Sequence, residues 1–123
     1  MASLQTADEI TTTLERLHGK RIVLLQVLGI NSLKSLTPSV DVLVGETVET
    51  SEAVDRVLTL RTGRHLIRFD LQRTGKVVWL RSNESFHLGA GSMPTARLIT
   101  EEGAIDLTEP AKTKRITVTV DDR

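Results

Sequence analysis

Apolar and polar residues alternate along several short runs of this chain, and this two-residue period constrains its fold more than any other feature. In residues 65–71, HLIRFDL, Ile67 and Phe69 fall on one side of an extended backbone and Arg68 falls on the other. Successive side chains of a β-strand point to opposite faces, so the pattern is typical of a half-buried strand. Residues 114–122, KRITVTVDD, repeat it. The chain is therefore expected to build sheets with one buried face.

Turn residues separate the other strand candidates. Thr62-Gly63 joins the two arms of a hairpin, and RTGK leads into the run VVWLRS. Residues 40–49 fit either a short helix or a strand that turns at Gly45. We expect strands in segments 21–30, 53–72 (two arms), 77–82, 96–100, 101–107 and 114–122.

Residues 6–19, TADEITTTLERLHG, form the one predicted helix. Thr6 can cap its first turn, with Glu9 three residues later to complete a capping box, and Gly19 can end it in a left-handed turn. Its apolar stripe consists of Ile10, Leu14 and Leu17. We predict a single domain over 1–123, mostly β with one N-terminal α-helix, arranged as an antiparallel β-sandwich or flattened barrel.

Composition excludes several functions. The chain has no Cys, so disulfides, thiolate metal sites and Cys nucleophiles are ruled out. The spacing of the three histidines fits no metal motif, and we expect neither a metal nor another cofactor. No apolar run approaches the roughly 20 residues of a membrane helix, and the N-terminus lacks a hydrophobic signal core. We therefore expect no membrane partner and a cytoplasmic location.

The charge is balanced overall but clustered locally. The formal net charge is zero, yet residues 56–81 contain seven Lys and Arg residues and a single acid, Asp70. This stripe is either a solvated strand face or a surface that faces phosphates, since neutralising phosphates with clustered cations releases counterions. The second arm of the predicted hairpin contains His65, which we expect to contact phosphate or nothing.

Residues 85–92, SFHLGAGS, interrupt the strand pattern with very small side chains. His87 has the best claim to a role among the histidines, and Glu84 is its nearest acid in sequence. The segment is either a Gly-rich turn or a loop whose backbone can approach a ligand closely. No catalytic constellation stands out from the residues alone.

The order of four segments resembles the N-terminal domain of the formamidopyrimidine-DNA glycosylase and endonuclease VIII family. The segments are MASLQTADEITTTLERLHGKRI, LKSLTP, LVGETVE with VDRVLTLRTGRHLIRFDL, and SFHLGAGS. In that family the His-Leu-Gly segment ends a strand and enters a loop that faces DNA. The resemblance implies a β-sandwich, a link to DNA repair and a nucleic-acid interface formed by Arg56, Arg61, Arg64, Arg68, His87, Gly89 and Gly91.

The catalytic positions of that family are not preserved. Ala2 stands at the family's proline nucleophile, Ser3 at its glutamate and Arg64 at its hairpin lysine, while Ala90 replaces a methionine. Ser3 cannot act as an acid, and Arg64 stays protonated, so it can bind phosphate but cannot transfer a proton. In the family a further strand, a helix–two-turns–helix domain and a finger follow, and residues 1–123 contain none of these parts.

Three functions follow as hypotheses. The first is a catalytically degenerate glycosylase-like domain that binds the backbone of DNA or RNA and has no enzyme activity. The second is a protein-interaction module whose partner docks on an exposed sheet edge, which we expect if the family's last strand is absent. The third is an active abasic-site lyase that uses the α-amine of Ala2 to form a Schiff base.

Overall fold

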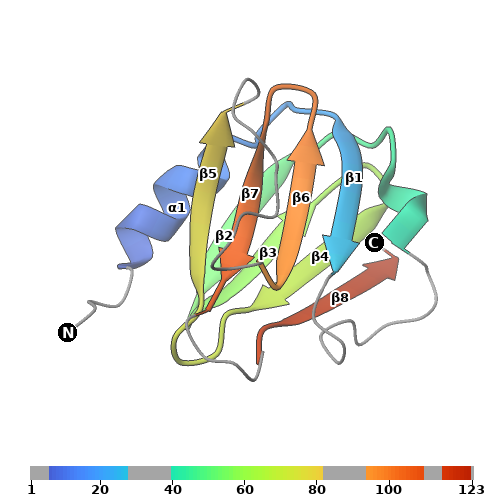
Figure 1. Cartoon of the computed structure of the whole chain (residues 1–123). Coiled ribbons are helices and arrows are strands. Elements are labelled where there is room, and N and C mark those ends of the chain that lie inside the picture. The colour runs from blue at the N-terminus through green and yellow to red at the C-terminus, as the bar shows by residue number, and fades with distance from the viewer. Residues whose placement is uncertain (1–5, 28–39, 82–93, 110–114, 123) are drawn as a thin grey trace.

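Two antiparallel sheets and one helix make up the described part of the chain. The computed structural model describes residues 6–27, 40–81, 94–109 and 115–122. The elements are α1 (Ala7–Glu15), β1 (Ile22–Val27), the 3-10 helix η1 (Val40–Leu43), β2 (Thr50–Val54), β3 (Val57–Arg61), β4 (His65–Asp70), β5 (Lys76–Arg81), β6 (Ala96–Thr100), β7 (Gly103–Thr108) and β8 (Thr117–Asp122). One sheet has the order β1-β6-β7-β5 and the other β2-β3-β4-β8 (Figure 1). The sheets do not close into a barrel, so the predicted sandwich is confirmed.

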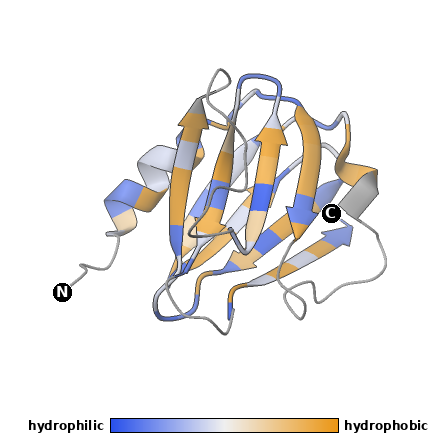
Figure 2. Cartoon of the chain, viewed as in Figure 1, coloured by the Kyte–Doolittle hydropathy of each residue, from blue (hydrophilic) through white to orange (hydrophobic). Residues whose placement is uncertain are grey.

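The two-residue period places the core between the sheets. In the β3–β4 hairpin, Leu58 pairs with Phe69 and Leu60 with Ile67, and all four side chains are fully buried. Hydrophobic and polar bands alternate along the strands in Figure 2, as the pattern requires. The facing sheet contributes another set of fully or almost fully buried side chains: Leu25, Val77, Ala96, Leu98, Ile105 and Leu107.

The helix is shorter than predicted. Thr6 and Glu9 form the expected capping box, but α1 ends at Glu15 and a turn follows to Gly19, whose φ is +79°. The predicted stripe is buried, because α1 packs against β2 and β5 at one side of the sandwich (Figure 1). Its nine residues cannot cross a bilayer, and no helix in the described residues is long and apolar enough to do so.

A second hairpin precedes the predicted one. β2 pairs with β3 through the two-residue turn Asp55–Arg56, and both turn residues have positive φ, 49° and 65°. Such turns match the twist of the strands and favour Gly or Asn, so an Asp-Arg turn gave no signal in the sequence. The segment expected as one long hairpin arm therefore contributes two strands.

Strand β8 completes the second sheet beside β4. Its inward side chains, Val118 and Val120, are fully buried, as the alternation predicted. β4 is the only described strand to which β8 is hydrogen-bonded, so β8 is the last strand of this sheet within the described residues.

Candidate nucleic-acid interface

The predicted interface residues are distributed over different parts of the fold. Three of the seven, His87, Gly89 and Gly91, lie outside the described residues, as do Ala2 and Ser3. Arg61 and Arg68 lie on one face of a sheet, Arg64 lies in the β3–β4 turn, and Arg56 lies in the β2–β3 turn. Whether they contact nucleic acid stays a prediction, and the structure defines the surface that each offers.

Arg61 and Arg68 share the outer face of the second sheet. Arg61 pairs with Leu66 and Arg68 with Thr59 across the β3–β4 hairpin, on the side opposite the buried residues. Both are exposed, and no acid in the described part of the chain forms an ion pair with either guanidinium. Acids are present on the same face, because Glu52 is opposite Thr59 and Asp121 is opposite Leu66. This face therefore presents two exposed guanidiniums with carboxylates near them.

Arg64 lies in the β3–β4 turn, beside the half-buried acid Glu46. Its backbone N–H donates to Glu46 Oε1 at 3.1 Å, while its side chain borders a shallow pocket with Glu46 and Glu49. Arg64 itself is exposed. The cation thus remains available to solvent, with two carboxylates near it.

His65 does not behave as predicted. It is 8% exposed, and its Nδ1 lies 2.6 Å from Glu46 Oε2, so it faces inward to an acid and not outward to phosphate. Thr62 Oγ1 donates to Glu46 Oε1 at 2.5 Å. Burial by itself raises the pKa of Glu46, but the hydrogen bonds from Thr62, the Arg64 amide and His65 outweigh it and hold the pKa below its ordinary value. The sequence period would have assigned His65 to the inner face, together with Ile67.

Arg56 fixes the backbone of two turns. Its Nε donates to the carbonyl of Gln72 at 2.7 Å, and its Nη2 donates to the carbonyl of Gly75. Leu71 N–H in turn donates to the carbonyl of Arg56 at 2.9 Å. These bonds tie the β2–β3 turn to the β4–β5 turn, so part of the guanidinium is already used within the protein.

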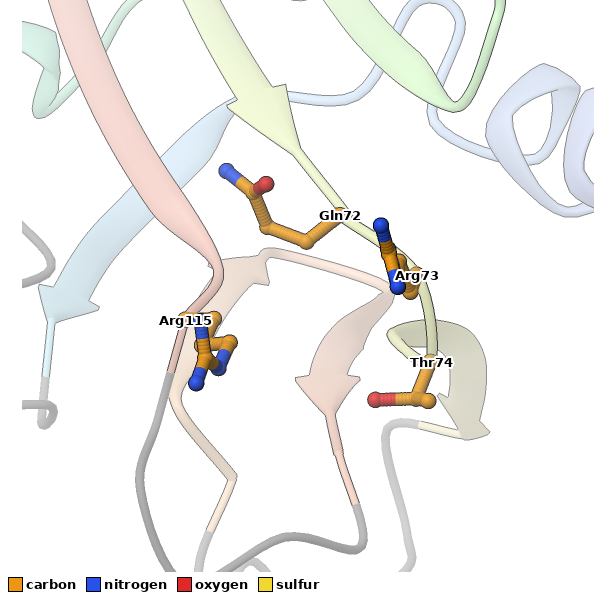
Figure 3. A pocket seen from close by; sticks show the side chains of 4 residues that line it. All are labelled: Gln72, Arg73, Thr74 and Arg115. Carbon is orange, nitrogen blue, oxygen red and sulfur yellow. The ribbon is translucent and has the colours of Figure 1, made fainter.

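Two arginines outside the predicted set line a pocket. Figure 3 shows Arg115, just before β8, on one side and Gln72, Arg73 and Thr74 of the β4–β5 turn on the other. The pocket has a volume of about 510 Å³. Arg73 was visible as part of the charged stripe, but Arg115 is 42 positions further along the chain and only the fold brings the two elements together.

The described residues hold no group of three or more His, Asp or Glu side chains placed to bind a metal ion.

Two further polar contacts join the helical N-terminal segment to the sheets. His18 Nε2 lies 2.7 Å from Ser51 Oγ, and the guanidinium of Arg16 lies over the ring of Trp79 at 5.7 Å. Trp79 packs against the core, as predicted for the only Trp.

Solved structures of Lactococcus lactis FPG in complex with DNA have a fold similar to that of this chain. Lactococcus lactis FPG (MutM) with DNA containing FAPY-dG is 13% identical, with 94% of this chain and 43% of that chain covered and a TM-score of 0.75. The same protein with DNA containing an abasic site is 12% identical, with 94% of this chain and 42% of that chain covered and a TM-score of 0.74. In its complex with DNA containing an oxidized pyrimidine, the identity is 13%, the coverages are 94% and 42%, and the TM-score is 0.75.

The likeness shows that this chain shares the fold of part of FPG. This chain spans less than half the length of the glycosylases that it matches. The sequence matches no family model and no curated protein.

Proposed function

We propose that this chain is a catalytically degenerate, DNA-glycosylase-like domain that binds the nucleic-acid backbone. The observation that carries the proposal is the fold, which matches FPG bound to DNA over 94% of this chain. Three guanidiniums of the β3–β4 hairpin support it, because Arg61, Arg64 and Arg68 are exposed and have no ion-pair partner among the described residues.

Phosphate contacts suit these side chains. A guanidinium presents a planar fork of donors that matches phosphate oxygens, and it remains charged at every relevant pH. Threonine hydroxyls at positions 59 and 119, in the same cross-strand row as Arg68, add neutral donors of the kind that commonly contact phosphates. Acids on the same face weaken the positive field, so we expect binding that is modest and highly sensitive to salt.

The degeneracy rests on the catalytic positions. Ala2 and Ser3 replace the proline and glutamate that the resemblance requires. Ser3 has no carboxyl group to transfer protons, and no other acid is assigned to that role. We therefore propose binding without base excision.

Fluorescence anisotropy of a labelled DNA duplex, titrated at several salt concentrations, tests the binding. Each phosphate contact contributes about −0.9 to the slope of log K against log salt. We expect R61Q and R68Q each to reduce the magnitude of this slope by about one unit. R21Q, an exposed Arg at the start of β1 in the other sheet, is the control with the same charge change. No binding at low salt, or an equal effect of R21Q, would contradict the proposal.

Borohydride trapping on a duplex with an abasic site tests the degeneracy separately. A Schiff base between an amine of the protein and the sugar would be reduced to a stable covalent adduct. We expect no adduct. An adduct that disappears when the Ala2 amine is blocked would instead establish the lyase function.

A protein-interaction module is the second candidate, and strand β8 favours it. It is the last described strand of its sheet, and an extended segment of another chain can add a strand beside such a strand. Backbone amide exchange measured with and without a co-purified partner tests it. Slower exchange along 117–122 would support a partner at this edge, and unchanged exchange would exclude the edge as the site.

A further inference from the structure

We propose that the pocket between the β4–β5 turn and the start of β8 binds a dianionic phosphomonoester. Its lining in the described part of the chain is Gln72, Arg73, Thr74 and Arg115. The pocket uses none of the hairpin arginines assigned to nucleic-acid binding, so the inference does not depend on the proposed function.

The charge of the lining selects an anion. Two guanidiniums contribute positive charge, a hydroxyl and an amide contribute neutral donors, and none of the lining side chains in the described part of the chain is acidic. Arg73 and Arg115 are exposed, and neither guanidinium has an ion-pair partner within residues 6–27, 40–81, 94–109 and 115–122. Two cations balance the two charges of a phosphomonoester, and each guanidinium can donate two parallel hydrogen bonds to phosphate oxygens.

Two acids of the described chain accept hydrogen bonds from the backbone of pocket residues. Asp70 Oδ1 accepts the N–H of Gln72 at 2.9 Å. Glu109 is 6% exposed, and its Oε1 accepts the N–H of Arg115 at 2.7 Å while its Oε2 accepts that of Ile116 at 3.1 Å. These bonds direct the carboxylates to the backbone that carries the pocket residues.

Both walls of the pocket are held in place by the fold. One wall is the turn that Arg56 fixes through the carbonyls of Gln72 and Gly75. The other wall is the backbone at Arg115, which Glu109 holds, and Glu109 is itself bonded to Thr95 Oγ1 at 2.7 Å. Figure 3 shows the Thr74 hydroxyl directed toward the side where Arg115 lies. A site whose backbone is fixed before binding loses little entropy when the ligand arrives.

Size favours a small molecule or the end of a chain. A volume of about 510 Å³ exceeds what one phosphate ion fills, and it lies within the range of small-ligand pockets. A phosphorylated sugar fits this description, whether it is free or forms the 5′ end of an oligonucleotide. The shared chemistry is a terminal phosphate on a ribose.

Titrations of the 15N-labelled full chain with ribose 5-phosphate and with ribose test the proposal. We expect saturable shifts of the amides of 72–75 and 115–116 with the phosphate ester and none with ribose. R73Q and R115Q should each weaken binding by roughly tenfold, the loss of one charged hydrogen-bonding partner. R21Q makes the same charge change at an exposed Arg that belongs neither to the pocket nor to the hairpin surface, and it should leave binding unchanged.

Two oligonucleotides of one sequence, with a 5′-phosphate or a 5′-hydroxyl, distinguish the sources. Tighter binding of the phosphorylated strand that is lost in R73Q indicates the end of a nucleic acid, whereas binding of ribose 5-phosphate alone indicates a free metabolite. Both results support the site. Shifts that do not saturate, or binding that R21Q weakens as much as R73Q, would overturn it. The spectrum of each unliganded variant shows whether it is folded.

Discussion

The carboxylate of Glu46 and the imidazole of His65 lie 2.6 Å apart, with side-chain exposures of 15% and 10%. Glu46 is in the segment between η1 and β2, and His65 is the first residue of β4. This contact, together with the bond from Thr62, attaches the turn that carries Arg64 to the preceding segment of the chain. A polar cluster therefore determines the position of one of the predicted phosphate contacts.

Glu46 should make the stability of the fold depend on acid. Its pKa is lowered below the ordinary value of 4.5, so its ionised form is stabilised by folding. This contribution is complete above that value and is lost as the pH falls through the lower pKa of the folded state. We expect E46Q to lower the free energy of unfolding by about 1–3 kcal/mol at neutral pH. Below neutral pH, the free energy of unfolding of E46Q should fall less steeply than that of the unmodified protein.

Chemical denaturation of E46Q between pH 3 and 7 measures the effect. E52Q is the matched control, because Glu52 is exposed on β2. Equal pH dependence of E46Q and the unmodified protein would show that the Glu46 bonds do not couple to folding.

Asp106 should be essential for folding because its partner is buried. Arg97 and Asp106 are directly opposite on β6 and β7, with Nε–Oδ1 and Nη2–Oδ2 distances of 2.6 and 2.9 Å. The hydrogen bond to Asp106, only partly offset by burial, raises the pKa of Arg97. D106N leaves this cation without its counterion and should cost about 3–5 kcal/mol in the free energy of unfolding.

The exposed pair Lys20–Glu102 provides the comparison for Asp106. Its N–O distance is 2.9 Å, but Glu102 is 62% exposed, so E102Q should change stability by less than about 1 kcal/mol. Urea denaturation of both variants tests the contrast. Similar losses in the two would contradict the view that burial sets the value of the Arg97–Asp106 pair.

Gly103 should not tolerate a side chain. A Cβ at this position would lie 2.5 Å from Trp79 Cζ2 and 2.8 Å from the carbonyl oxygen of Leu80. We expect G103A to cost about 1–3 kcal/mol, because the indole or the strand must move. Gly63 is the control, since its nearest neighbour would be Glu49 Oε2 at 3.9 Å. Thermal unfolding should therefore show a lower Tm for G103A and little change for G63A.

The cap of α1 should stabilise it measurably. Thr6 Oγ1 accepts the N–H of Glu9 at 3.1 Å, and the Thr6 N–H donates back to the Glu9 carboxylate at 3.3 Å. T6A should cost about 1 kcal/mol, as removal of an N-cap usually does. T12A, at an exposed position inside the helix, should be neutral or slightly stabilising because Ala has the higher helix propensity. Equal effects in a urea titration would show that the cap is not used.

Local periodicity made most of this fold predictable. The alternation around Phe69 and Val118 identified β4 and β8 and their buried faces, and the Thr62-Gly63 turn identified the hairpin between β3 and β4. The Asp55–Arg56 turn was missed because Arg, at its second position, does not signal positive φ as Gly would. The early end of α1 was missed because the apolar stripe continues to Leu17 through a turn that is no longer helical.

Side-chain partners were much harder to predict. Charge counting treated Arg56 and Arg68 as equivalent, yet the first donates to two backbone carbonyls and the second faces solvent. His65 was grouped with the cations because of its neighbours in sequence, whereas its acid partner lies 19 residues earlier. The Arg73–Arg115 pocket depends on a contact between distant elements, which no local pattern contains.

The position of β8 has a consequence for how this molecule is made. Its neighbour β4 is synthesised some fifty residues earlier, as the pairing of Asp70 with Thr117 and of His65 with Asp122 shows. Until residues 117–122 leave the ribosome, β4 has no strand beside it at the position of β8. The incomplete sheet can then bind a chaperone or another nascent chain. Translation speed and chaperone supply should therefore influence the yield of this protein more than they would for a fold of local hairpins.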